Sequence, residues 1–167
     1  MPTKLEHRAE YAASAACLHA ALCDEQYWTD LVNTVAPEVS SLEAFTSDGA
    51  SVTVQLQQIV PADKLPSIVS KIRAGDLVIR RTFSVGPFSD RATGSFRAEV
   101  AGANATLSGT VTVAGSGDHA TLAYDGTAKV GIPLVGGKIE GAIISNLTKL
   151  FDAEDEFTTD WLAAKPG

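Results

Sequence analysis

Residues 77–130 carry one pattern throughout: apolar and polar side chains alternate, and turns rich in glycine separate the alternating runs. The runs cover residues 77–85, 91–101, 105–113 and 119–130. Because successive side chains of a strand point to opposite faces, each run predicts a strand with one covered and one solvated face. Such strands are typical of antiparallel sheets, so this region predicts a meander.

The segments before this meander predict further strands and helices. Alternating runs that predict strands cover residues 5–13, 41–47 and 51–60. Ser14 and Asp24 are suitable N-caps for two short helices, which we expect to end near Cys23 and Asn33. Apolar residues at helical spacing predict another helix over residues 62–74.

The C-terminal part of the chain predicts one long amphipathic helix. Its apolar stripe carries Ile139, Ile143, Leu147, Leu150, Phe157 and Trp161, with Glu154 on the same stripe. Pro133 suits its first turn, and a span of about 30 residues would measure ~45 Å at 1.5 Å per residue. A sheet with one apolar face and a long amphipathic helix bury these surfaces against each other. The sequence therefore predicts a single α+β domain over residues 1–167 with a helix-grip fold, a curved seven-stranded antiparallel sheet around the C-terminal helix.

Small residues recur on the face of the sheet that we expect to be covered. They are Ala9, Ala44, Ala92, Gly94, Ala98, Gly109, Gly126 and Ala128. Small side chains do not fill the space beneath a sheet, so either the helix packs very closely or a cavity remains. Because protein interiors are close-packed, a lasting cavity favours a ligand or water inside it.

Composition and charge exclude several functional classes. The net charge of −7 argues against nucleic acids and anionic membrane surfaces, both of which attract clustered Lys and Arg. No apolar stretch approaches the ~20 residues of a membrane span, and no signal peptide is expected. Cys17 and Cys23 would lie about 9 Å apart on one helix, too far for a disulfide. Two thiols in such a chain predict a cytoplasmic protein.

Arg81 lies on the otherwise apolar face of its strand, where a guanidinium needs a partner. Glu154, on the apolar stripe of the last helix, could supply one, and we hypothesise an Arg81–Glu154 pair inside the grip. The alternatives are that Arg81 extends to the sheet edge or that a bulge shifts the register of its strand.

Other candidates for chemistry are weaker. His7 and Tyr11 share the inward face of the first strand and Tyr124 that of the last, where they could act as acid–base groups or as ordinary core residues. His19 and His119 have no partners at metal spacing, so no metal site is predicted. Gly136-Gly137-Lys138 lacks the spacing of a phosphate loop and indicates close approach of the last helix to the sheet. No cofactor and no catalytic residue are predicted.

The order of these elements resembles the START/Bet v 1-like superfamily (SRPBCC, polyketide cyclase/dehydrase-like), and within it an actinobacterial family of unknown function, DUF2505. The resemblance covers nearly the whole chain. It is carried by Tyr27-Trp28, the meander Leu77–Val130, and the segment from Val135-Gly136-Gly137-Lys138-Ile139-Glu140 through Trp161-Leu162. It implies binding of apolar compounds such as lipids, sterols or polyketides. The helix at 62–74 departs from the shortest members of the superfamily.

Three functions stay open from the sequence. The first is a cytoplasmic binding or carrier protein for an apolar molecule such as a lipid, sterol-like or polyketide-like compound, as a monomer or weak homodimer. Its pocket candidates are Tyr11, Arg81, Phe83, Phe96, Leu122, Tyr124, Ile143, Leu147 and Phe157. The second is an enzyme of cyclase or dehydratase type that uses His7, Tyr11, Tyr124 or Arg81. The third is a protein-interaction module with a filled core, whose contact surface an exposed Trp28 or Phe88 would mark.

Overall fold

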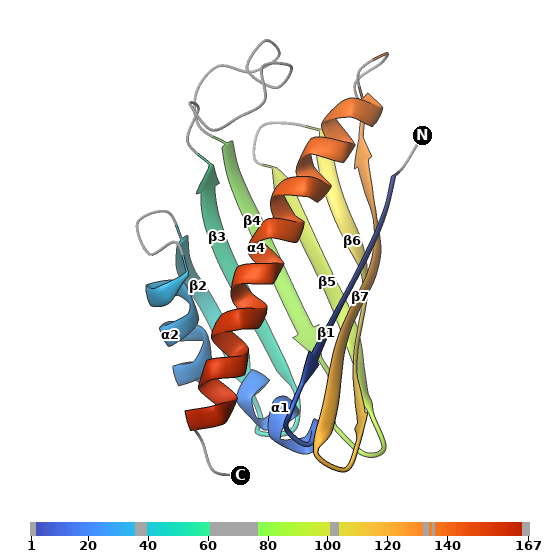
Figure 1. Ribbon diagram of the computed structural model, residues 1–167. Coiled ribbons are helices and arrows are strands. Elements are labelled where there is room, and N and C mark those ends of the chain that lie inside the picture. Colours follow the sequence, from blue (N-terminus) through green and yellow to red (C-terminus); the bar gives the residue numbers. More distant parts are fainter. Residues whose placement is uncertain are drawn as a thin grey trace.

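The computed structural model describes residues 3–35, 40–60, 77–100, 104–131, 134 and 136–164. Within these residues, seven strands form one curved antiparallel sheet, and the long helix α4 lies across its concave face (Figure 1). This arrangement confirms the predicted helix-grip fold. No described helix combines the length and the hydrophobicity needed to cross a membrane.

The strands follow one another across the sheet, with a single exception at the edge. They are β1 (Thr3–Tyr11), β2 (Ser40–Ser47), β3 (Val52–Val60), β4 (Leu77–Val85), β5 (Ala92–Val100), β6 (Ala105–Ser116) and β7 (His119–Val130). The spatial order is β1-β7-β6-β5-β4-β3-β2, so the first strand pairs with the last. β6 is longer than expected, because its pairing with β7 continues to Ser116 opposite His119.

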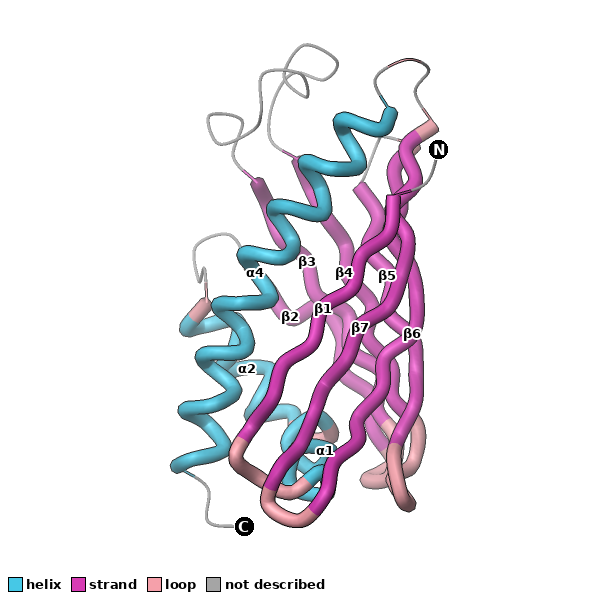
Figure 2. Tube along the Cα trace, turned by 45° about the vertical axis from the view of Figure 1, so that its right-hand side comes forward, coloured by secondary structure: helices cyan, strands magenta, loops and turns pink. Residues whose placement is uncertain are grey.

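The helices are α1 (Ala15–Leu22), α2 (Glu25–Thr34) and α4 (Gly136–Ala164). Both predicted N-caps are confirmed: Ser14 Oγ accepts the N–H of Cys17 at 3.1 Å, and Asp24 Oδ1 accepts that of Gln26 at 2.9 Å. α1 closes one end of the concave face, and α2 lies between β2 and the C-terminal part of α4 (Figures 1 and 2). The helix predicted over 62–74, and Pro133, lie outside the described residues.

The glycines of the inner face, the face toward α4, have a different role from the one expected. A Cβ at Gly94 or Gly109 would collide with the backbone of the neighbouring strand. At Gly126 it would lie 2.6 Å from a facing carbonyl oxygen and 2.7 Å from the Phe96 ring. These residues therefore allow β4–β7 to bend tightly, and they do not leave empty space beneath the sheet.

Ala44 is a second correction, because it is exposed and does not belong to the covered face. The register of β2 on β3 shifts between Leu42, which pairs with Leu56, and Ala44, which pairs with Gln55. The extra residue turns Ala44 to the outer face beside Gln55.

The first turn of α4 approaches the sheet closely, as predicted, but only one of its glycines is responsible. A Cβ at Gly136 would lie 2.8 Å from the carbonyl oxygen of Val130. A Cβ at Gly137 would meet no atom within 4 Å. Gly136 therefore allows α4 to start against the end of β7.

Candidate ligand-binding site between the sheet and α4

A cavity of about 20 Å³ lies between the inner face of the sheet and the middle of α4. Its lining consists of Leu56, Arg81, Thr82, Phe83, Phe96, Arg97, Ala98, Leu107, Tyr124, Leu147 and Phe151. A volume of this size holds about one water molecule, which needs roughly 10–15 Å³. The described part of this interior is therefore close to filled by side chains.

Aromatic rings form much of the cavity wall. The Tyr124 ring stacks on Phe151 with centroids 4.7 Å apart and an interplanar angle of 14°. Phe96 meets Tyr124 edge-on at 5.2 Å, and Phe83 lies 6.4 Å away. The guanidinium carbon of Arg81 stands 5.3 Å from the centroid of Phe151, a cation–π distance. The wall thus combines planar apolar surfaces with the cation of Arg81, and Arg97 is a second cationic lining residue.

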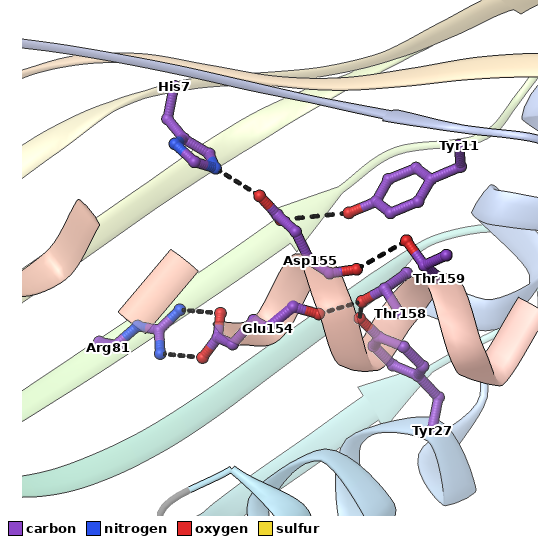
Figure 3. Close-up of polar contacts among 8 residues, drawn as sticks. All are labelled: His7, Tyr11, Tyr27, Arg81, Glu154, Asp155, Thr158 and Thr159. Carbon is purple, nitrogen blue, oxygen red and sulfur yellow. Dashed lines mark hydrogen bonds and ion pairs between the residues drawn. The ribbon is translucent and has the colours of Figure 1, made fainter. Parts of the chain in front are cut away.

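Arg81 and Glu154 form the pair that the sequence suggested. Nη1 of Arg81 donates to Oε2 of Glu154 at 2.7 Å and Nη2 donates to Oε1 at 3.1 Å (Figure 3). The side chains are 14% and 13% exposed. β4 keeps an unbroken register with both neighbouring strands, which excludes the bulge alternative. Burial lowers the pKa of Arg81, but the charge and hydrogen bonds of Glu154 outweigh it and hold the pKa above its ordinary value.

Asp155, the next residue of α4, contacts the strand β1 at one edge of the sheet. Its Oδ2 lies 2.6 Å from Nε2 of His7, and its Oδ1 accepts from the Tyr11 hydroxyl at 3.2 Å (Figure 3). Desolvation raises the pKa of Asp155, and the hydrogen bonds from His7 and Tyr11 offset only part of that. Burial raises the pKa of Tyr11 above its ordinary value, and Asp155 adds to the rise. His7 and Tyr11 therefore join β1 to α4.

Tyr27 of α2 completes this group of contacts. Its hydroxyl lies 2.6 Å from Oγ1 of Thr158, which itself donates to the carbonyl oxygen of Glu154 at 2.7 Å (Figure 3). Because the Thr158 proton is used in the second bond, Tyr27 is the donor in the first. We call this set, His7, Tyr11, Tyr27, Arg81, Glu154, Asp155 and Thr158, the polar layer.

One group in this region has ligands of the kind that bind metals. His7, Asp152 and Asp155 each place one ligand atom within 4.8 Å of the others. However, His7 and Asp155 already form a hydrogen bond at 2.6 Å, and Asp152 is exposed. We therefore assign His7 and Asp155 to holding α4 against β1.

A second set of hydrogen bonds, made by Glu140 and called the Glu140 tie below, fixes the N-terminal end of α4 to the sheet. The Glu140 carboxylate is buried; its Oε2 accepts the N–H of Val130 at 2.9 Å, and its Oε1 accepts the Thr3 hydroxyl at 2.7 Å. These two donors lower the pKa of Glu140 below its ordinary value. Between this tie and the polar layer, no hydrogen bond or ion pair joins residues 141–153 to the described part of the sheet.

The predicted pocket residues divide into two groups. Those that line the cavity are Arg81, Phe83, Phe96, Tyr124 and Leu147. Those that do not are Tyr11, Leu122, Ile143 and Phe157. Tyr11 contacts Asp155, Leu122 is core, Ile143 is half-buried, and Phe157 packs on Tyr27 with centroids 5.8 Å apart. Binding of a ligand by any of them stays a prediction.

Several lining residues were not anticipated. They are Leu56, Thr82, Arg97, Leu107 and Phe151, whereas Ala98 was expected on the covered face but not as a pocket residue. Phe151 had a usable signal, because it follows Leu147 by one helical turn on the same stripe. Trp28 is a further correction: it is buried, with Nε1 donating to the carbonyl oxygen of Leu22 at 2.8 Å, so it marks no contact surface. Phe88 is half-buried against His19.

Comparison with known proteins identifies a family model and a relative that match almost the whole chain. A family model described as protein of unknown function (DUF2505) matches residues 6–162. An uncharacterized protein of Mycobacterium tuberculosis (strain H37Rv) is 30% identical over 172 residues, covering 97% of this chain and 98% of that protein.

Two solved structures are similar over nearly their whole length. Norcoclaurine synthase from Thalictrum flavum, in complex with dopamine and hydroxybenzaldehyde, gives a TM-score of 0.59 at 14% identity, over 100% of this chain and 90% of the synthase. A START superfamily protein from Mycobacterium smegmatis gives 0.51 at 15% identity, over 95% of this chain and 98% of that one. At such identities the likeness is one of fold.

Proposed function

The chain belongs to the DUF2505 family of the START/Bet v 1-like superfamily, and from this premise we propose that it binds or carries an apolar small molecule between the sheet and α4. The ligand is of a lipid, sterol-like or polyketide-like kind, with mostly apolar surface. Both thiols, Cys17 and Cys23, stay outside disulfides, which supports action in a reducing compartment such as the cytoplasm.

The observation that carries this proposal is the contrast along α4. Polar ties hold the helix at Glu140 and again at Glu154 and Asp155. The span between them covers roughly 20 Å at about 1.5 Å per residue, and its side chains meet the cavity through Leu147 and Phe151. Between these ties the helix has apolar contacts and the cation–π contact of Phe151 with Arg81, but no hydrogen bond or ion pair to the described sheet, so it can serve as a lid over an apolar site.

Ligand entry requires this lid to move, because the cavity of about 20 Å³ is far smaller than a drug-sized site of roughly 300–1,000 Å³. Ile143 and Ile144 lie on the same span and are only half-buried. Outward displacement of the span would enlarge the cavity while the polar ties stay formed. A ligand would then replace the apolar contacts that the lid gives up.

The same geometry supports an enzymatic function less well than a binding function. A cyclase or dehydratase needs acid–base groups that face its substrate. His7 and Asp155 are absent from the lining of the described cavity, and the hydroxyl of Tyr11 is bonded to Asp155. These groups join α4 to β1. Tyr124 and Arg81 do line the cavity, but burial raises the pKa of Tyr124, and Arg81 is paired with Glu154, so the geometry favours binding over chemistry.

A fluorescence titration with N-phenyl-1-naphthylamine tests the proposal. We expect saturable enhancement at one probe per chain. Ala98→Val, which fills the cavity, should weaken binding by about tenfold, equivalent to roughly 1.4 kcal/mol. The control is Ala123→Val, the same change on the outer face of β7, which should leave the affinity unchanged.

Two outcomes would contradict the proposal. Absence of saturable binding to the folded wild-type chain would favour the interaction module with a filled core. Equal weakening by both alanine variants would place the probe outside the cavity. Native mass spectrometry of the protein from its own source would then identify the class of any bound molecule.

A further inference from the structure

Tyr124 places a hydroxyl with no described partner beside the cavity. The residue is 8% exposed, and its ring stands on the inner face against Phe151 and Phe96. No hydrogen bond among the described residues uses its oxygen, although no fully sealed side-chain polar atom lacks a partner. Tyr124 lines the cavity, and its hydroxyl has no hydrogen-bond partner there among the described residues. Burial raises its pKa, so it stays protonated and can donate.

Arg81 offers further donors into the same space. A guanidinium carries five N–H groups, and the two bonds to Glu154 use one N–H on each terminal nitrogen. The remaining N–H groups have no acceptor among the described residues, and Arg81 lines the cavity together with Tyr124. Two different elements, β4 and β7, thus each contribute a lining residue with hydrogen-bond donors to one small volume with aromatic walls.

The charge of the site selects among acceptors. Glu154 already neutralises Arg81 through two hydrogen bonds, and Glu99 pairs with Arg97, the other cationic lining residue. A carboxylate ligand would add a second negative charge beside Glu154 and Asp155 in a buried space, and an uncompensated buried charge is costly. A carbonyl or hydroxyl oxygen accepts the same hydrogen bonds without that cost.

We propose that the apolar ligand, whose binding rests on the function proposed above, carries an uncharged carbonyl or hydroxyl oxygen that accepts hydrogen bonds from Tyr124 and Arg81. Planar rings fit the aromatic part of the remaining wall, which is formed by Phe83, Phe96 and Phe151. Tyr124 is then the residue that determines preference for an oxygenated ligand over a plain hydrocarbon. Free fatty acids and other carboxylates are disfavoured.

Two probes of one shape test this inference. 6-Propionyl-2-dimethylaminonaphthalene presents a ketone, and 6-dimethylamino-2-naphthoic acid presents a carboxylate on the same ring system. We expect the wild-type chain to bind the ketone at least tenfold more tightly, about 1.4 kcal/mol. Tyr124→Phe should remove about tenfold of the ketone affinity and shift its bound emission to the blue, while N-phenyl-1-naphthylamine still binds.

Tyr27→Phe is the matched control, because the Tyr27 hydroxyl is committed to Thr158 and does not line the cavity. It should leave the preference for the ketone unchanged. If Tyr124→Phe fails to fold, the comparison of ketone with acid on the wild-type chain still decides the matter.

The outcomes separate the two proposals. Equal affinity for ketone and acid, or unchanged ketone binding by Tyr124→Phe, overturns the inference and leaves the binding function standing if N-phenyl-1-naphthylamine still binds. Failure of all three probes to bind the folded wild-type chain overturns both.

Discussion

The two ends of α4 are fixed to the sheet by different chemistry. At the N-terminal end, a buried carboxylate receives uncharged donors, the backbone N–H of Val130 and the hydroxyl of Thr3. At the C-terminal end, Glu154 and Asp155 receive a guanidinium from β4 and an imidazole from β1. The first tie depends mainly on the main chain, whereas the second depends on side chains, of which Arg81 also lines the cavity.

This difference separates structural fixation from recognition. A backbone N–H is present whatever residue occupies the position, so the Glu140 tie needs little beyond the carboxylate itself. A buried ion pair often stabilises no more than apolar residues of equal volume, because desolvation offsets the attraction. An Arg81–Glu154 pair in an aromatic interior is therefore better explained by its position beside the cavity than by the stability it provides.

Loss of one partner of the Arg81–Glu154 pair should lower the stability of the fold more than the other substitutions proposed below. Arg81→Met leaves the Glu154 carboxylate uncompensated and should lower the free energy of unfolding by about 3 kcal/mol. The double variant Arg81→Met/Glu154→Leu should recover most of that loss. Urea denaturation of the single and double variants measures both values. A loss below about 0.5 kcal/mol for Arg81→Met would mean that solvent screens the pair as on an open surface.

Replacing Glu140 should lower the stability less, by an amount that depends on whether the new side chain can accept a hydrogen bond. Glu140→Leu leaves the Val130 N–H without an acceptor and should lower Tm, by less than Arg81→Met does, because no buried charge is left behind. Glu140→Gln keeps an oxygen that can accept this N–H and should recover part of the loss. Thermal unfolding followed by circular dichroism measures the series. Equal Tm values for the Leu and Gln variants would show that the Val130 bond contributes nothing.

Sequence patterns located these two ties unequally. Arg81 stood out because strand alternation places a charge on an apolar face, and helical spacing put Glu154 on the facing stripe. Glu140 gave no such signal, because its main partner is a backbone N–H that no side-chain pattern reveals. Asp155 belongs to an acidic run that favours solvent, and its partner His7 depends on β1 closing against β7, an order that alternation alone does not specify.

The fold itself was largely predictable, because the alternating runs and the helical stripe give the type and place of most elements within a few residues. The cavity was less so. Gly94, Gly109 and Gly126 suggested empty space, but their role is to let neighbouring backbones approach. A glycine leaves a cavity only where no neighbouring backbone moves into the space of its absent side chain. Whether that happens depends on the curvature of the sheet, which the composition of the chain does not reveal.

The two ties should also respond to pH in opposite directions. Glu140 has a folded-state pKa below its ordinary value of 4.5, so its stabilisation is complete above pH 4.5 and is lost as pH falls through the folded pKa. Asp155 has a folded-state pKa above its ordinary value of 3.8, so its contribution is present below pH 3.8 and is lost as pH rises through the folded pKa. Unfolding free energies of Glu140→Gln and Asp155→Asn, each subtracted from wild type between pH 3 and 6, should slope in opposite senses. Parallel slopes would contradict this assignment.

The smallest changes in stability should come from substitutions of the α4 glycines. These substitutions test the close contact between the first turn of α4 and the end of β7. Gly136→Ala places a Cβ 2.8 Å from the carbonyl oxygen of Val130, so the helix must shift, at a cost of about 1 kcal/mol. Gly141→Ala meets no atom within 4 Å and should stabilise by roughly 0.5–1 kcal/mol, since alanine has the higher helix propensity. Urea denaturation resolves differences of this size. Because both substitutions add one methyl group to the same helix, their opposite signs would isolate the packing of Gly136 against β7. Stabilisation by both would show that α4 does not rest on Val130, and the Glu140 tie would then lack the close approach on which its hydrogen bond depends.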